Sequence, residues 1–377
     1  MKKRNLYLGI MFLTLSYYSC RANEYSKNII YDFKQSTWKF NIGDDSQWSK
    51  KDFSDNDWET ITIGKSWEEQ GYVGYDGFAW YRKKFLMPEY DYKKSLMLYI
   101  ENIDDVDEIY FNGVLIGSTG KMPENYITGY GWVRKYYIPE ELIKKNDYNY
   151  ISVRVYDDGG EGGIVGSKMF LYVNDYEKFL KINLSGDWKI HFTEVKDWKS
   201  TDYNDNHWKS IKVPMIWESQ GYFDYNGYAC YRKTFYITNN IDLSSEVYLL
   251  LGKVDDYDKV YINGECIGEL SPYRNLGEFS RIRGEYNTFR AYKIPKNLLL
   301  HGKNVICVKV YDETLQGGIY EGPVGITDKQ SFKEFKDRYS NKSFFESENN
   351  VDNEFFEVLN NIADGFSKII DEIFNDN

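Results

Sequence analysis

The stretch Glu108-Ile109-Tyr110-Phe111-Asn112-Gly113 decides the fold, because a short strand-like run ends there in a hairpin turn. A type I′ turn needs positive φ at both central residues, and Asn-Gly meets that need better than most dipeptides. The same pattern returns where Lys259 to Ile262 is followed by Asn263-Gly264. Further short alternating runs lie at Ser95 to Glu101, Ile151 to Tyr156, Val247 to Leu251 and Val305 to Tyr311. The sequence therefore predicts antiparallel strands and little helix.

Both hairpins belong to a long internal repeat. Trp67 recurs as Trp217, and Gln70-Gly71-Tyr72 recurs as Gln220-Gly221-Tyr222, each at an offset of 150 residues. Copies of about 140 residues are far longer than solenoid repeats, so we expect two complete domains. The predicted domains are residues 30–174 and 182–335. For each domain we predict an all-β sandwich of two sheets closed by turns.

The composition excludes several classes of function. The chain has 377 residues, 42% of them hydrophobic, and a net charge of −11 from 47 basic and 58 acidic residues. A nucleic-acid partner is not expected, because binding phosphates requires a basic face. Three widely separated histidines and four cysteines without paired spacing argue against a zinc site and against a histidine-activated nucleophile.

Residues 1–20 have the pattern of an export signal that ends in a lipid-attachment cysteine. Lys2-Lys3-Arg4 precede an apolar run from Leu6 to Leu15, and Cys20 follows a serine. Acylation of Cys20 would tether the mature protein stably by more than one chain. The alternative is a plain secretory signal, whose cleavage would discard this cysteine. We expect an exported, membrane-anchored bacterial lipoprotein of the outer membrane or periplasm, because Arg21 is not the aspartate associated with inner-membrane retention.

Residues 340–377 form an acidic segment of a different kind. Its apolar residues recur at spacings of three and four, which predicts an amphipathic helix. The apolar stripe consists of Phe355, Leu359, Ile362, Phe366, Ile369 and Ile373. Such a helix either docks on a sandwich or associates with a second copy as a short coiled coil.

Four strings of the first copy have close counterparts in the second copy. They are Trp67 to Tyr72, Phe78 to Lys83, Ile103 to Gly113 and Val153 to Asp157. In this order they resemble the jelly-roll sugar-binding domain of family 2 glycoside hydrolases, and similar galactose-binding-like domains accompany sialate O-acetylesterases. The resemblance implies two tandem jelly rolls. In those enzymes the domain accompanies a catalytic domain, for which the acidic segment after the second copy is too short, so we expect binding without turnover.

Aromatic and planar polar residues gather in one glycine-punctuated stretch of each copy. Sugar binding needs aromatic faces against pyranose rings and polar side chains that fix the hydroxyls. The candidate carbohydrate-binding residues are Trp67, Gln70, Tyr72, Tyr75, Asp76 and Trp80 in the first copy and Trp217, Gln220, Tyr222, Tyr225 and Asn226 in the second. The alternative is that the tryptophans fill the sandwich core.

Charged residues near the turns suggest two structural roles. Arg82 is predicted to form an ion pair with Asp105, and Arg232 is predicted to form one with Asp256. Clustered carboxylates near the same turns would suit a structural calcium ion, the one cofactor considered. Its candidate ligands are Asp104, Asp107, Asp255 and Asp258. Aspartate before an Asn-Gly hairpin is also ordinary turn chemistry.

The function expected from these features is non-catalytic binding of a glycan or polysaccharide at the cell envelope. The other expected partners are the membrane, through the lipid anchor, and a glycan-processing protein. A structural or protein-interaction module is the alternative. A third hypothesis is an enzyme, for which the resemblance would imply a family 2 glycoside hydrolase or an acetylesterase. A pair of carboxylates at catalytic separation would be required for the glycosidase.

Overall fold

The computed structural model describes residues 28–223, 225–238, 245–270, 285–339 and 344–347. The chain divides into two compact units, Met1–Glu177 (unit 1) and Lys178–Asn377 (unit 2). The predicted export signal with Cys20 lies outside the described residues, and so does the apolar stripe of the predicted C-terminal helix. Within that predicted helix, Phe344–Ser347 is described, and it forms a strand.

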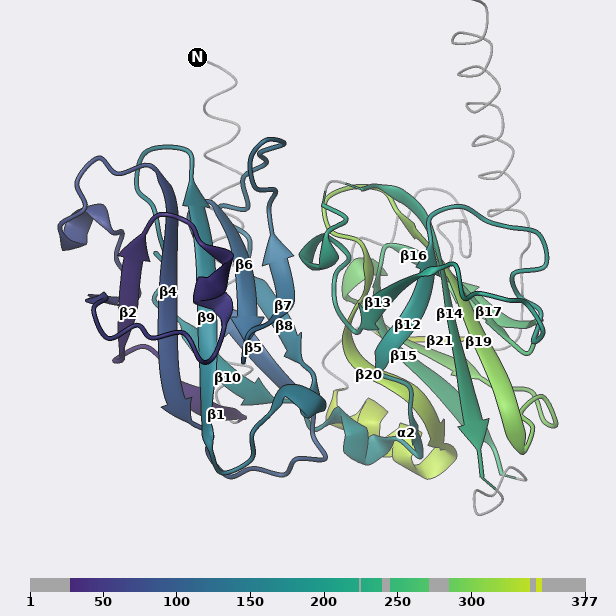
Figure 1. Cartoon of the computed structure of the whole chain (residues 1–377). Coiled ribbons are helices and arrows are strands. Elements are labelled where there is room, and N and C mark those ends of the chain that lie inside the picture. The colour runs from purple at the N-terminus through teal and green to yellow at the C-terminus, as the bar shows by residue number, and fades with distance from the viewer. Residues whose placement is uncertain (1–27, 224, 239–244, 271–284, 340–343, 348–377) are drawn as a thin grey trace, which may run out of the picture. The chain divides into compact units, whose positions relative to one another are not determined.

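Unit 1 is a sandwich of two antiparallel sheets (Figure 1). The four-stranded sheet has the order β1-β10-β5-β8, and the six-stranded sheet has the order β3-β2-β4-β9-β6-β7. The strands are β1 Ile29–Asp32, β2 Thr37–Ile42, β3 Glu59–Thr62, β4 Gly77–Leu86, β5 Leu96–Ile100, β6 Val106–Phe111, β7 Val114–Thr119, β8 Arg134–Ile138, β9 Tyr148–Asp157 and β10 Met169–Val173.

Unit 2 is also a sandwich of two sheets, antiparallel except where its last described strand pairs in parallel, so the predicted all-β fold with two sandwiches is confirmed. Its sheets have the orders β11-β20-β15-β18-β21 and β13-β12-β14-β19-β16-β17. The strands are β11 Ile182–Asn183, β12 Gly186–His191, β13 Lys209–Val213, β14 Gly227–Ile237, β15 Val247–Asp255, β16 Tyr257–Ile262, β17 Glu265–Leu270, β18 Phe289–Lys293, β19 Gly302–Asp312, β20 Gly318–Asp328 and β21 Phe344–Ser347. In the described part of the chain, the α-helix is α2, Lys329–Arg338, and no helix there is long and apolar enough to cross a membrane.

The predicted Asn-Gly turns join the central hairpins of both units. Between β6 and β7, Asn112 has φ of 49° and Gly113 has φ of 89°. Between β16 and β17, Asn263 and Gly264 have φ of 50° and 89°. The Asn112 side chain also donates a hydrogen bond to the Leu142 carbonyl oxygen at 2.8 Å. Positive φ at both positions is what a type I′ turn requires, so the hairpin prediction is confirmed.

The core of each unit lies between its two sheets, because successive strand residues point to opposite faces. In β9 of unit 1, Val153 and Val155 are fully buried in this core. Arg154 and Tyr156 alternate with them on the outer face and are half-buried. The same alternation places Asp157, the last residue of the strand, on the core side.

A buried ion pair bridges the two sheets of each unit. In unit 1, Arg134 Nε lies 2.7 Å from Asp107 Oδ1, both side chains are fully buried, and the Tyr136 hydroxyl donates to Asp107 Oδ2 at 2.6 Å. Arg290 and Asp258 form the equivalent pair in unit 2 at 2.9 Å. The prediction that Asp107 and Asp258 bind calcium is therefore wrong, because each carboxylate forms an ion pair with an arginine from the opposite sheet.

Candidate functional site

The tryptophans predicted to stack on sugar lie in the sandwich cores. Trp67 and Trp217 are fully buried. Each indole ring packs so closely on a backbone glycine, Gly162 or Gly317, that a Cβ atom there would overlap the ring. Trp80 is also fully buried, beneath the outer face of its sheet. The prediction that these three rings contact sugar is therefore wrong, and the alternative core role is confirmed for Trp67 and Trp217.

The two predicted glutamines hold a loop to a strand. Gln70 Oε1 accepts a hydrogen bond from the Thr62 amide at 2.9 Å, and Gln70 Nε2 donates to the Thr62 carbonyl oxygen at 3.0 Å. Gln220 makes the same pair of bonds to Lys212, at 2.6 and 3.0 Å. Because their polar atoms are used within the protein, these side chains support the loops and do not offer donors to a ligand.

The predicted tyrosines are half-buried, and their hydroxyls are bonded within the protein where partners are described. The Tyr72 hydroxyl donates to Glu59 at 2.7 Å, and burial together with this carboxylate raises the pKa of Tyr72 to about 12. The Tyr75 and Tyr225 hydroxyls each donate to a backbone carbonyl oxygen at 2.7 Å. Tyr222 packs on an adjacent phenylalanine ring. Of the predicted polar residues, Asp76 and Asn226 are exposed.

Arg82 anchors a loop and does not pair with Asp105 as predicted. Its Nε atom donates to Asp55 at 2.9 Å, and the arginine side chain is fully buried. Arg82 lies on the outer face of β4, as Phe78 does. The loop that precedes β3 covers the Arg82 guanidinium and accepts a hydrogen bond from it. The predicted ion pair between Arg82 and Asp105 is wrong, because Arg82 pairs with Asp55 of the covering loop.

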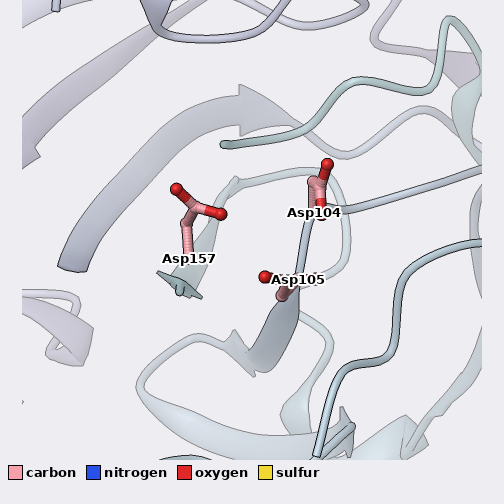
Figure 2. A group of neighbouring side chains, drawn as sticks. All are labelled: Asp104, Asp105 and Asp157. Carbon is pink, nitrogen blue, oxygen red and sulfur yellow. The ribbon is translucent and has the colours of Figure 1, made fainter. Parts of the chain in front are cut away.

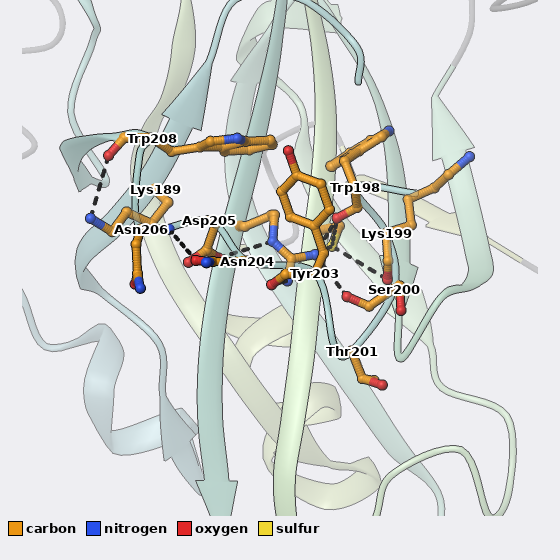
Figure 3. A network of polar contacts seen from close by, with 12 residues as sticks. Lys189, Trp198, Lys199, Ser200, Thr201, Tyr203, Asn204, Asp205, Asn206 and Trp208 are labelled. Atoms are coloured by element: carbon orange, nitrogen blue, oxygen red, sulfur yellow. Dashed lines mark hydrogen bonds and ion pairs between the residues drawn. The ribbon is translucent and has the colours of Figure 1, made fainter. Parts of the chain in front are cut away.

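Arg232 has the equivalent role in unit 2. Its Nε atom donates to Asp205 at 3.0 Å, which replaces the predicted pair with Asp256. The guanidinium also donates to backbone carbonyl oxygens of the loop before β13 (Figure 3). The loop residues that accept these bonds are Trp198, Ser200 and Tyr203. Both arginines therefore serve the fold.

Three carboxylates meet at one end of each sandwich. In unit 1, Asp104 and Asp105 precede β6, and Asp157 ends the neighbouring strand β9 (Figure 2). One oxygen atom from each of them lies within 4.8 Å of the other two. The equivalent residues of unit 2, Asp255, Asp256 and Asp312, form the same arrangement. We call these two groups the aspartate trios. Asp104 and Asp255 were predicted as metal ligands from the sequence, whereas Asp157 and Asp312 were not.

The members of a trio differ in how they are bonded. Asp105 accepts hydrogen bonds from the Thr128 hydroxyl at 2.5 Å and the Asp158 amide at 3.2 Å. Burial acts to raise the pKa of Asp105, but these hydrogen bonds outweigh it and lower the pKa. Asp157 is fully buried; its Oδ1 accepts a 3.3 Å bond from the Gly159 amide, and its Oδ2 has no hydrogen-bond partner.

Four of the trio carboxyl groups, those of Asp104, Asp157, Asp255 and Asp312, have raised pKa values. Burial, followed by the hydrogen bond and charge of the adjacent aspartate, raises the pKa of Asp104 to about 8. Burial and the adjacent aspartate likewise raise the pKa of Asp255 to about 10. Burial is also the main reason that the pKa values of Asp157 and Asp312 rise to about 6 and about 7. Each trio is therefore a place where negative charge lacks compensation.

Aromatic rings lie beside the trio on the outer face of the six-stranded sheet. In unit 1 the ring of Tyr156 lies 4.8 Å from Phe78 and 5.7 Å from Tyr126, centroid to centroid. In unit 2 the rings of Tyr228 and Tyr311 lie 5.1 Å apart. We call Phe78, Tyr126 and Tyr156, with Tyr228 and Tyr311 in unit 2, the aromatic patches. Their members are half-buried.

A charged pair accompanies each aromatic patch. The Arg154 guanidinium lies 4.6 Å from the Phe78 ring centroid, and its Nε donates to Asp44 at 2.7 Å. In unit 2, Lys309 Nζ lies 4.5 Å from the Tyr228 ring centroid and 2.6 Å from a Glu194 oxygen. The same combination of ring, cation and carboxylate thus recurs in both units. This combination was not predicted from the sequence, although its members occupy matching positions in the repeat.

The chain thus contains two tandem jelly-roll sandwiches. Each sandwich carries an aspartate trio and an aromatic patch. No family model matches the chain. A β-galactosidase of Bacteroides ovatus is 25% identical over 130 residues, and a β-glucuronidase of Formosa agariphila is 26% identical over 152 residues. These matches cover 31% and 36% of this chain but only 14% of either relative.

Weak matches among solved structures include β-glucuronidases. A Bacteroides uniformis β-glucuronidase matches 74% of this chain and 28% of its own, with a TM-score of 0.34 and 16% identity. A β-glucuronidase from glycoside hydrolase family 2 matches 77% of this chain and 27% of its own, with a TM-score of 0.35 and 17% identity. The chain thus contains a region similar to the sugar-binding domain of family 2 glycoside hydrolases.

Proposed function

We propose that this chain binds carbohydrate without catalysing its turnover, and that the aromatic patches contact the sugar rings. The observation that carries the proposal is the recurrence of an aromatic pair with a cation over one ring in both units. The relatives named as a β-galactosidase and a β-glucuronidase support carbohydrate as the ligand class.

The chemistry of the patch suits a pyranose ring. Aromatic faces pack against the apolar C–H face of a sugar, and Tyr156 and Phe78 offer such faces at the ends of neighbouring strands. Arg154 and Asp44 lie beside them and are bonded to each other, but their side chains are 19% and 33% exposed, so their spare N–H groups and lone pairs can meet sugar hydroxyls. Two patches on one chain would strengthen retention on a polymer relative to a monosaccharide, because the second contact is intramolecular.

A comparison of patch variants tests this function. Tyr156→Ala and Phe78→Leu each remove an aromatic face, and we expect the affinity of unit 1 for its glycan to fall about tenfold, which corresponds to ~1.4 kcal/mol. The full chain would first be screened on a glycan array, and its retention would then be measured by affinity electrophoresis in gels that contain the bound polysaccharide.

Tyr148→Ala is the matched control, because this ring is half exposed at the opposite end of the same strand. We expect its retention to equal that of the wild type. Circular dichroism of each variant separates a lost contact from a lost fold. Equal retention of Tyr156→Ala, Phe78→Leu and the control would contradict the assignment of the patch.

We further propose that the chain acts at the cell envelope, attached to a membrane through acylated Cys20. The charged start, apolar run and terminal cysteine of residues 1–20 support this placement. In cells grown with labelled palmitate, we expect the label in the wild type and none in Cys20→Ser, which should leave the membrane fraction. Membrane association of Cys20→Ser at the wild-type level would argue against the anchor.

A further inference from the structure

The two aspartate trios share no residue with the aromatic patches beside them, and the proposed carbohydrate contact does not use the trio carboxylates. We propose that each trio binds one calcium ion, held in unit 1 by Asp104, Asp105 and Asp157 and in unit 2 by Asp255, Asp256 and Asp312. The proposal does not depend on carbohydrate binding. It concerns a metal site in which two consecutive aspartates that precede one strand meet the last residue of the strand paired with it.

The spacing of the oxygen atoms fits one shared cation. Calcium binds oxygen ligands at about 2.4 Å, so two ligands of the same ion lie at most about 4.8 Å apart. In each trio, one oxygen from every aspartate meets this limit with respect to both others. Oxygens from three separate residues therefore lie within the span that the ligands of a single ion can have.

Buried carboxylate oxygens without partners point to a ligand. Asp157 is fully buried, and its Oδ2 has no hydrogen-bond partner. Asp312 is 1% exposed, and neither of its carboxylate oxygens has a partner within hydrogen-bonding geometry. An unsatisfied buried carboxylate costs free energy that a coordinated cation would offset. Both residues end a strand on the core side, directed toward the adjacent pair of aspartates.

The cation nearest to the trio in unit 1 is paired with a different carboxylate. Arg134 is the nearby cation, and its Nε is bound to Asp107 in the buried pair. The negative charges of Glu68 and Asp76 act on Asp157 in addition to that of Asp105. Among the described residues, no lysine or arginine forms an ion pair with a member of either trio. A divalent cation would supply the positive charge that these clustered carboxylates lack.

The ligand chemistry selects calcium among the common metals. All candidate ligands are carboxylate oxygens, which hard cations prefer, whereas zinc and copper sites use histidine or cysteine. Calcium accepts irregular sets of six to eight oxygens, so backbone carbonyl groups and water would complete the shell. Magnesium demands a near-ideal octahedron and releases water reluctantly, so it should bind more weakly here. Asp104 and Asp255 are half-buried, which gives the ion a route from solvent.

Calcium titration of the full chain after treatment with a chelator tests the proposal. We expect isothermal titration calorimetry to give two calcium ions per chain, and elemental analysis after gel filtration to give the same ratio. Asp157→Asn and Asp312→Asn should each reduce the ratio from two to one, and the double variant should bind none. Magnesium should bind at least about tenfold more weakly than calcium.

Glu161→Gln and Glu313→Gln are the matched controls, because each removes an exposed carboxylate from the loop that follows one trio. Both should retain two calcium ions. Terbium luminescence sensitised by nearby tyrosines, and its displacement by calcium, gives a second reading that needs no variant. The proposal is overturned if the folded wild type binds no calcium at millimolar concentration, or if the aspartate variants retain the wild-type ratio.

Discussion

Replacement of Asp107 by asparagine is expected to lower the free energy of unfolding of unit 1 by about 3–5 kcal/mol. The Asp107 carboxylate pairs with Arg134 at 2.7 Å, and both side chains are fully buried. Asparagine has nearly the same shape, so the variant leaves the guanidinium charge buried without its counterion. Loss of one partner lowers the free energy of unfolding by far more than the pair itself contributes, because the remaining buried charge is neither paired nor hydrated.

Differential scanning calorimetry would measure this effect. We expect the melting temperature of unit 1 to fall by roughly 6–20 °C, given the usual 2–4 °C per kcal/mol for domains of this size. Glu140→Gln is the control, because Glu140 pairs with Lys145 on the surface, where the two side chains are 62% and 46% exposed. An exposed pair contributes at most about 1 kcal/mol. Similar stability of Asp107→Asn and Glu140→Gln would refute the structural role of the buried pair.

Replacement of Trp67 by alanine is the second change with a large expected effect. Removal of this fully buried ring would leave a cavity at the end of the sandwich, at a cost of about 3–5 kcal/mol in the free energy of unfolding. The opposite change, Gly162→Ala, should also destabilise unit 1, because the new Cβ atom would overlap the Trp67 ring. The two effects have one cause, which is the close contact between this ring and the glycine-rich loop.

Urea unfolding of Trp67→Phe, of Gly162→Ala and of the double variant Trp67→Phe/Gly162→Ala would test that cause. Phenylalanine lacks the part of the indole that meets the new methyl group, so we expect Gly162→Ala to cost less in the Trp67→Phe background than in the wild type. Tyr148→Ala, which removes an exposed ring, should change stability by less than about 0.5 kcal/mol. Additive costs in the double variant would contradict the contact.

The architecture was predictable from the sequence because its signals are local. Alternation along strands such as Glu108 to Phe111, and the Asn112-Gly113 turn after them, depend on neighbouring residues alone. The repeat then extends each local signal to the second unit. The role of Trp67 was left open for a physical reason: an aromatic ring between glycines fits a core as well as it fits a binding surface.

The site was less predictable because its residues come together across the fold. Arg82 finds Asp55 in a covering loop, and the distance between them in sequence gives no reason to prefer it over Asp105. Strand alternation could have excluded Asp107 as a surface ligand, since it shares the core face with Ile109. For Asp157 the available signal was the repeat, which places an aspartate at the same point of both copies.

The central claim is that the aromatic patches form the carbohydrate contact, and a direct binding measurement with a double variant tests it. Oligosaccharides from the polysaccharide that retains the chain most strongly would be titrated into the wild type and into Tyr156→Ala/Tyr311→Ala by calorimetry. We predict saturable binding by the wild type and a loss of at least about tenfold in the double variant, with the fold of both chains intact by circular dichroism. Undiminished binding by the folded double variant would place the sugar elsewhere and contradict the account.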